Sequence, residues 1–265
     1  MKFKSPRTPH LIGSGIPDSG NASERLDWNH LSGRHVVLEE KIDGSEVSFH
    51  FDSDVNLIAR ERANVIDQSS RGGAEKHLDA YKDWLTVRAG DFFERIEDRY
   101  IVYAEWCALA HCIFYDALPD CFVEIDVQDK RTGEFLSTDR RVELLAGLGV
   151  VQAPVLFEGS ASRQSHPREF VTRSAFASAD PHTTWRASNS RLRGGSDSER
   201  FDLTGLSEGI YGKIEEGGVV VERFKWIRED FVRRIVCGGR HWRMLEPTAN
   251  VVADQNPSSF STLTF

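Results

Sequence analysis

The chain is built around short runs of β-branched and aromatic residues that tight-turn residues separate. Within residues 35–61 the runs are HVVLEE, EVSFHF and VNLIARE, and Asp43-Gly44 stands between the first two. Runs of this length and composition, separated by turn residues, predict β-strands. This pattern restricts the chain to folds that contain β-sheet.

Later segments repeat the pattern. YIVYAEWCAL, CFVEIDVQD and VVQAPVLFEG each predict a strand, and GIYGKIEE and VVVERFKWI flank Gly217-Gly218 as the two arms of a hairpin. Helical spacing appears over residues 74–98, where we expect two amphipathic helices broken near Gly90. DRRVELLAGLG predicts a short helix that ends at a glycine.

The remaining segments have weaker patterns. Residues 1–34 are rich in Gly, Ser and Pro and predict an irregular lead-in with a short helix near its end. We expect a helix near 167–176, then a mobile loop, and a helix that begins at Arg228. Since strands and helices are mixed without strict alternation, the sequence predicts an α+β fold with antiparallel sheets rather than a doubly wound parallel sheet.

Composition excludes several classes of protein. A chain of 265 residues can form one large domain, alone or with a small appendage. The net charge of -8 argues against coating nucleic acid through bulk charge, but it leaves room for a local basic groove. No run is long and apolar enough to span a membrane, and the amino-terminal MKFKSPRTPH lacks the apolar run of a secretory signal.

The cysteines point to a reducing compartment. None of Cys107, Cys112, Cys121 and Cys237 forms a C-x-x-C pair or stands at zinc-ligand spacing from histidines. We therefore expect free thiols and a cytoplasmic protein.

Lys41 is the first candidate for chemistry. In Glu40-Lys41-Ile42-Asp43-Gly44 it stands at a predicted strand end, directly before a turn that would expose its ammonium group. A lysine is a nucleophile only when neutral, so its pKa of about 10.4 should be lowered by burial or by nearby positive charge. Alone, this motif is more often an ordinary surface turn.

Further charged and aromatic residues recur in or beside the predicted strands. They are Arg60, Arg62, Glu105, Phe122, Glu208, Arg223 and Lys225. Cations offset charge on phosphates, carboxylates hold ribose hydroxyls or a hydrated metal, and an aromatic ring stacks on a base. Arg223 and Lys225 lie two apart in a strand and therefore point to the same side. Taken singly, Glu105 and Glu208 could be surface carboxylates, and Phe122 could belong to the core.

The order of these motifs resembles the covalent nucleotidyltransferases, the superfamily of ATP-dependent ligases and mRNA capping enzymes. The motifs that carry the resemblance are EKIDGS, YAEW, FVEIDV, SEGIYGK and ERFKWIREDF, within roughly residues 35–235. The sequence is most similar to RNA ligases of the RNA ligase 2 type. The resemblance implies a nucleotidyltransferase (ATP-grasp-like) domain with antiparallel sheets flanked by helices.

The resemblance also implies a role for each residue. Lys41 would form the phosphoramidate with AMP, and Glu40 would accept a hydrogen bond from the adenine amino group. Phe122 would stack on adenine. Arg62, or else Arg60, would contact the ribose or the end phosphate. Glu105 would hold the ribose or a metal-bound water, and Glu208 would hold the metal through water. Arg223 and Lys225 would bind the α-phosphate.

Two positions depart from the family pattern. Arg223 stands where lysine is usual, and Ile125 replaces the aromatic residue that usually precedes the aspartate, here Asp126. About thirty residues follow the last motif, too few for the OB-fold domain of DNA ligases and capping enzymes. We therefore expect a lead-in over 1–34, an adenylation domain over 35–235 without an OB-fold, and a short tail over 236–265.

The resulting hypothesis is an ATP-dependent RNA ligase that joins 5′-phosphate and 3′-hydroxyl ends, with magnesium, or manganese in its place, as the metal. A DNA nick ligase, a GTP-dependent capping enzyme and an inert nucleic-acid end-binding module remain alternatives. RNA and repair proteins would be the partners, and no membrane is expected. A cationic surface for the strand could come from the arginines of 186–200 and from Arg233, Arg234, Arg240 and Arg243.

Overall fold

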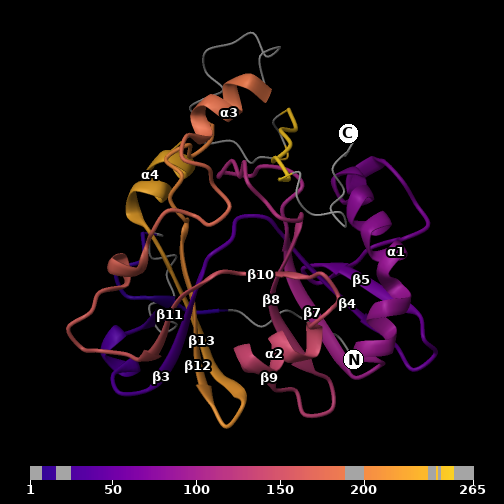
Figure 1. The fold of residues 1–265 in the computed structure, drawn as a ribbon, viewed down its shortest axis with the longest axis horizontal. Helices are drawn as coiled ribbons and strands as arrows, with labels where there is room; N and C mark the ends of the chain where they lie inside the picture. The colour runs from indigo at the N-terminus through magenta and orange to yellow at the C-terminus, as the bar shows by residue number, and fades with distance from the viewer. Residues whose placement is uncertain (1–7, 16–24, 189–199, 238–242, 244–245, 254–265) are drawn as a thin grey trace.

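The computed structural model describes residues 8–15, 25–188, 200–237, 243 and 246–253 (Figure 1). Their strands join one long sheet. Its main path runs in the order β11 (Val155–Ser160), β3 (His35–Glu40), β12 (Gly209–Glu216), β13 (Val219–Ile227), β9 (Phe135–Leu136), β8 (Phe122–Asp129), β7 (Tyr100–Trp106), β4 (Ser45–Phe51), β5 (Leu57–Glu61) and β6 (Asn64–Val65). Three short strands branch from it: β1 (His10–Leu11) pairs with β13 and with β2 (Arg25–Leu26), and β10 (Val151–Gln152) pairs with β8.

The pairing along the main path is antiparallel throughout, as the sequence predicted. The hairpin at Gly217-Gly218 forms between β12 and β13 as expected. In Figure 1 the strands separate into two groups, with β3, β11, β12 and β13 on one side and β4, β5, β7 and β8 on the other. β9 joins the two groups by pairing with both β13 and β8.

The helices lie around this sheet. They are the 3-10 turns η2 (Trp28–Leu31), η3 (Gly73–Leu78) and η4 (Pro167–Phe170), and the α-helices α1 (Asp79–Ile96), α2 (Thr138–Leu145), α3 (Pro181–Ser188) and α4 (Glu229–Cys237). In Figure 1, α1 flanks β4 and β5, whereas α3 and α4 gather at the upper end of the molecule. None of the helices among the described residues combines the length and apolarity needed to cross a membrane.

The predicted break near Gly90 is wrong, because α1 runs through this residue as one helix of 18 residues. Gly90 is exposed and a Cβ there would meet nothing within 4 Å. A glycine inside a helix costs about 1 kcal/mol relative to alanine. The buried face of α1, with Tyr81, Trp84 and Phe92 in the core, outweighs that cost.

The helix predicted near 167–176 is also wrong. Only the short turn η4 forms there, and α3 begins at Pro181, where a loop was expected. Asp180 explains this start, since its carboxylate accepts hydrogen bonds from the backbone N–H of Thr183 (3.1 Å) and from its hydroxyl (2.5 Å). An aspartate before a proline at the first helical position is a start signal that sequence reading can detect.

The lead-in and the tail both join the domain core. Leu11 and Leu31 are fully buried against Val36, Leu38 and other apolar residues of the β3–β12–β13 side. In the tail, Asn250 accepts a hydrogen bond from Tyr115 N and donates one to Cys107 O, both at 2.8 Å. After β13, the described residues comprise α4 and short segments, and these form no barrel.

Candidate active site

Lys41 follows β3 directly, at the edge where β3 meets the start of β12. Its backbone N–H donates to the carbonyl of Gly209 at 3.1 Å, and its Nζ lies 2.6 Å from Glu208 Oε2. An added Cβ on Gly209 would come within 1.9 Å of the Trp226 carbonyl oxygen, so only glycine fits there. Strand pairing therefore brings together two of the predicted residues that are far apart in the sequence.

The Asp43-Gly44 turn docks this lysine against β7. Asp43 Oδ2 accepts hydrogen bonds from the backbone N–H groups of Cys112 and Ile113, both at 2.8 Å. A Cβ on Gly44 would lie 2.9 Å from the Trp106 carbonyl oxygen. The turn thus has a structural reason for both of its residues, and it places Lys41 where the charge of Glu105 acts on it.

The electrostatic setting of Lys41 is the reverse of the predicted one. Burial by itself would lower the pKa of Lys41, but the carboxylates of Glu208, Glu105 and Asp43 outweigh burial and raise it above the ordinary value. The ammonium form is therefore favoured in the empty protein. Since the nucleophile is the neutral amine, the proton on Lys41 has to leave when the chemistry begins.

Glu105 has an oxygen without a hydrogen-bond partner among the described residues. Its Oε2 is buried with no hydrogen bond, and burial followed by the charge of its cross-strand neighbour Glu46 raises the pKa well above the ordinary value. Lys41 opposes that rise. A carboxyl group in this position can accept or share a hydrogen with a bound hydroxyl, because its second oxygen is uncommitted.

Lys225 is an uncommitted cation beside this pair. Burial and then the charge of Lys41 lower the pKa of Lys225. Among the residues that the structure describes, no carboxylate lies within ion-pair distance of its Nζ. Two neighbouring lysines that repel each other form a suitable place for a phosphate group.

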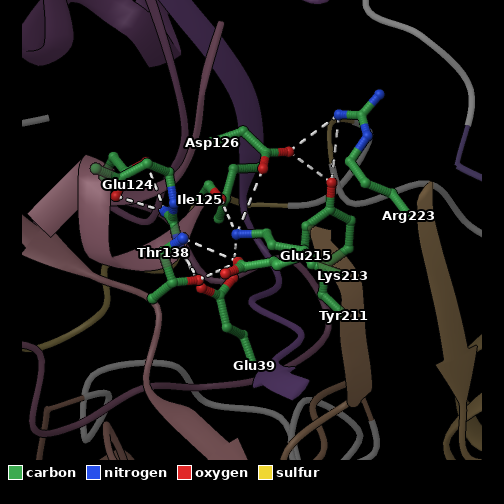
Figure 2. A network of polar contacts seen from close by, with 10 residues as sticks. Glu39, Glu124, Ile125, Asp126, Thr138, Tyr211, Lys213, Glu215 and Arg223 are labelled. Carbon is green, nitrogen blue, oxygen red and sulfur yellow. Dashed lines mark hydrogen bonds and ion pairs between the residues drawn. The ribbon is translucent and has the colours of Figure 1, made fainter. Parts of the chain in front are cut away.

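Arg223 lies on the same strand and the same face as Lys225. Its guanidinium is held in place by Asp126 and Tyr211 (Figure 2). Its Nη1 donates to Asp126 Oδ2 at 3.0 Å, and the Tyr211 hydroxyl donates to the same oxygen at 2.6 Å. The guanidinium also lies 3.8 Å from the centre of the Phe135 ring. Arg223 is thereby fixed in orientation, whereas Lys225 is not.

The support of Arg223 continues into a buried network that sequence reading missed (Figure 2). Lys213 Nζ donates to Glu39 Oε2 at 2.7 Å and to the Ile125 carbonyl at 2.6 Å. Arg141 of α2 donates to Glu124 at 2.7 Å and also pairs with Glu39. Its ion pairs join the cations Arg141, Lys213 and Arg223 to the carboxylates of Glu39, Glu124 and Asp126, three charges of each sign.

A β-bulge in β8 allows that network to form. The register passes from Tyr103 opposite Asp126 to Ala104 opposite Glu124, which leaves Ile125 without a partner. One extra residue reverses the alternation of faces. As a result Phe122 and Val127, an odd number of positions apart, both pack in the core beneath α1.

Phe122 does not occupy the place expected for it. Its ring is fully buried and stacks on Trp84, with 4.3 Å between centroids. No face of the ring remains for a base, so this placement does not agree with the prediction of adenine stacking. The alternative interpretation, that Phe122 is a core residue, describes its environment.

Glu40 points away from Lys41, as neighbours in a strand do. It is 1% exposed, and its Oε2 accepts a hydrogen bond from Ala175 N at 3.0 Å. Its Oε1 has no partner in the part of the chain that the structure describes. Burial raises the pKa of this carboxyl, against the hydrogen bonds from Ser174 and Ala175. An unpaired buried oxygen is costly unless a ligand donates to it.

The structure separates the two candidate arginines. Arg60 of β5 is partly buried and lies opposite Ser48 of β4. Its charge acts on Tyr103 of β7. Arg62 is exposed at the β5–β6 turn, with φ of 53°. This placement favours Arg60 as the residue that faces the site.

The described carboxylates, cysteines and histidines contain no group of three that could hold a metal ion by themselves. Glu105 and Glu208 lie near Lys41, as expected, and two carboxylates suit a magnesium ion that keeps waters and substrate phosphates as its other ligands. The residues present therefore fit a metal that arrives with a nucleotide.

The predicted cationic surface is only partly visible. Of the 186–200 segment, residues 189–199 lie outside the described residues, as do Arg240 and the side chain of Arg234. Arg233 pairs with Glu229, and Arg243 pairs with Glu61. These two arginines are already neutralised within the chain.

Comparison with solved structures supports the fold. RNA ligase of Naegleria gruberi matches in a mutant solved with ATP and Mn (TM-score 0.51, 12% identity, 88% of this chain and 63% of that chain). The same enzyme solved with PPi gives a TM-score of 0.51, 13% identity and coverage of 88% and 64%. The chain thus spans less than two thirds of the length of these structures, and at such identity the likeness concerns the fold alone.

Sequence comparison identifies the family. No curated protein matches the sequence. The profile of the RNA ligase family matches residues 34–227, which include Lys41, Glu105, Glu208, Arg223 and Lys225. The chain belongs to the RNA ligase family.

Proposed function

We propose that this chain is an ATP-dependent RNA ligase that joins a 5′-phosphate to a 3′-hydroxyl through a lysyl-AMP intermediate on Lys41. The observation that carries the proposal is the ion pair of Lys41 with Glu208, 2.6 Å long, beside the uncommitted Lys225. Family membership and the unpaired oxygens of Glu40 and Glu105 support it, since both oxygens suit the hydroxyl or amino donors of a nucleotide.

The reaction divides into three displacements. The amine of Lys41 attacks the α-phosphorus of ATP, an N–P bond forms, the P–O bond to pyrophosphate breaks, and Lys41 loses a proton. An oxygen of the RNA 5′-phosphate then attacks the same phosphorus, and Lys41 leaves and regains a proton. Finally the 3′-hydroxyl oxygen attacks the 5′-phosphate, its proton is lost, and AMP departs.

The residues of the chain have separate tasks in this scheme. Lys225 and the fixed guanidinium of Arg223 hold α-phosphate oxygens, and Glu105 accepts a hydrogen bond from ribose. Glu208 keeps Lys41 in place until the nucleotide binds. Magnesium, for which manganese could substitute, would offset charge on the departing pyrophosphate when bound with ATP at Glu105 and Glu208.

The cellular setting is part of the proposal. RNA with free 5′-phosphate and 3′-hydroxyl ends would be the substrate, and repair proteins would be the partners. The thiols of Cys107, Cys112 and Cys121 are free, which supports a reducing compartment such as the cytoplasm.

Intact-mass measurement after incubation with ATP and magnesium tests the proposal. We expect the wild type to gain one AMP, and we expect Lys41→Ala and Lys41→Arg to gain none. An adduct that persists in Lys41→Ala would falsify the mechanism. Labelling by GTP but not ATP would favour a capping enzyme, and adenylation without end-joining of any nicked RNA would exclude ligase activity.

A further inference from the structure

The lead-in segment places a histidine beside the phosphate-binding lysine. In the sheet, β1 runs parallel to β13 with His10 opposite Lys225. Three hydrogen bonds fix this pairing: Lys225 N to Pro9 O at 2.9 Å, Ile227 N to Ser14 Oγ at 3.0 Å, and Gly15 N to Ile227 O at 2.7 Å. Residues opposite each other in neighbouring strands share a face, so His10 and Lys225 lie on the same side of the sheet.

The hydrogen bonds of His10 leave one ring nitrogen available. Nδ1 lies 2.9 Å from Ser14 Oγ. Ser14 already accepts the N–H of Ile227, and its own hydroxyl hydrogen is then free to go to Nδ1. This arrangement favours the tautomer in which Nε2 carries the hydrogen, and Nε2 has no partner among the described residues.

Three positive charges lower the pKa of His10. They come from Lys225 on β13, Arg25 on β2 and Lys41 after β3. Burial, followed by these three cations, lowers the pKa of His10 to about 4, so the ring is neutral in the empty protein. His10 and Lys225 share one face of the sheet, and a hydrogen-bond donor beside a cation that no described carboxylate pairs with matches the chemistry of a polyanion.

We propose that His10 is a phosphate-binding residue of this site, which donates its Nε2–H to an oxygen of the nucleotide polyphosphate beside Lys225. The inference rests on the proposed nucleotide-binding function. It adds a residue from a segment outside the motifs that define the family resemblance.

A pH dependence follows from this role. A bound polyphosphate would replace the repulsion of Lys225, Arg25 and Lys41 by attraction, which raises the pKa of His10 in the complex. Between about pH 4 and that higher pKa, binding takes up a proton, so affinity increases as pH falls. Below about pH 4 the ring is charged in both states and this gain levels off.

The experiment compares two substitutions that each imitate one ring nitrogen. His10→Asn places its amide near Nδ1 and keeps the link to Ser14, whereas His10→Gln reaches the position of Nε2 but cannot become charged. Binding of α,β-methylene-ATP with magnesium is measured by calorimetry at about pH 6.5, near the ordinary histidine pKa, in buffers of different ionisation enthalpy. His35→Gln, on an exposed histidine that pairs with Glu158, serves as the control.

We expect His10→Asn to weaken binding by about tenfold, the loss of one charge-assisted hydrogen bond, and His10→Gln to weaken it less. Proton uptake on binding should disappear in both variants and remain in His35→Gln. If His10→Asn binds as tightly as the wild type with the same proton uptake, the inference is wrong and the proposed function is unaffected. If the wild type itself does not bind the analogue, both the proposed function and the inference are wrong.

Measurement on the unmodified chain removes any dependence on the folding of the variants. The His10 ring is followed by NMR over pH in the empty protein and with inorganic pyrophosphate. We expect its midpoint to start near 4 and to rise by at least about one pH unit with pyrophosphate. A midpoint that pyrophosphate does not move would overturn the proposal.

Discussion

At the residue scale, Lys41 and Glu208 show how a nucleophile can be held inactive by its own site. The ion pair stabilises the charged amine, although burial acts in the opposite direction. Groups that arrive with the substrate must therefore shift Lys41 to its neutral, nucleophilic form, because the empty site favours the protonated form.

Amine labelling tests this state of Lys41. We expect Glu208→Gln to lower the pKa of Lys41, because the substitution removes the carboxylate that contributes most to raising it. Each pKa unit lost increases the neutral fraction about tenfold at a pH below the pKa. Labelling by acetic anhydride at about pH 9, read by peptide mass spectrometry against exposed Lys76, should therefore be faster in Glu208→Gln than in the wild type. Equal labelling of Lys41 in the two proteins would contradict the prediction.

Glu40 offers a second test at this scale. Its unpaired Oε1 can only accept while the carboxyl is ionised, which suits the adenine amino group and opposes the guanine carbonyl. We expect a preference for ATP over GTP of at least tenfold, about 1.4 kcal/mol. In Glu40→Gln the ratio should fall, because an amide can also donate. Adenylation and guanylation rates of the two proteins give both ratios, and an unchanged ratio would exclude Glu40 from base selection.

At the element scale, a buried arginine helps to join α2 to the sheet. Arg141 is 1% exposed and connects Glu39 of β3 with Glu124 of β8. Removing one partner from a buried ion pair leaves an uncompensated charge, which is the costly case. The helix therefore contributes to the position of Arg223 through residues that are buried in the network.

Stability measurements on two adjacent arginines test the role of Arg141. We expect Arg141→Ala to lower the free energy of unfolding by about 3–5 kcal/mol. Arg140→Ala, on the exposed neighbour that donates to the Gly218 carbonyl, should cost less than about 1 kcal/mol. Urea unfolding gives both values, and similar losses would show that the network does not stabilise the fold.

Gly90 provides an opposite prediction for α1. Because it lies exposed within a continuous helix and a Cβ there meets nothing within 4 Å, Gly90→Ala should stabilise the protein by about 0.5–1 kcal/mol. Thermal unfolding of the variant and the wild type checks this. A decrease in melting temperature would contradict the prediction and show that the protein requires glycine at this position.

At the scale of the whole molecule, the candidate site lies where distant parts of the sheet meet. Lys41 directly follows β3, Glu105 comes from β7, Arg223 and Lys225 come from β13, and β1 of the lead-in adds His10. Net charge is -8, so a nucleic acid strand has to be attracted by local cations around this region.

End-joining assays test the substrate at this scale. We expect sealing of nicks whose 3′-hydroxyl side is RNA and weak activity on all-DNA nicks, because RNA is distinguished by its 2′-hydroxyl and A-form shape. Matched nicks that differ only in the last nucleotides give the ratio of rates. Equal rates on both nicks would make a DNA nick ligase the better description.

The sequence by itself determined the main strands and the hairpin at Gly217-Gly218, because these depend on local pattern. Motif order predicted that Lys41, Glu105, Glu208 and Lys225 act together. It could not determine which way a side chain faces where the alternation changes. The bulge at Ile125 buried Phe122, and the continuous packing of α1 outweighed Gly90.

Only the tertiary structure decided the electrostatic setting of Lys41 and the contribution of distant segments to the candidate site. The pKa of Lys41 is raised because the carboxylates of Glu208, Glu105 and Asp43, brought together by the fold, outweigh the effect of burial. His10 joins Lys225 because β1 adds to the far edge of a strand that lies more than two hundred positions later in the chain. Such effects depend on distances between atoms, and no local pattern in a sequence contains those distances.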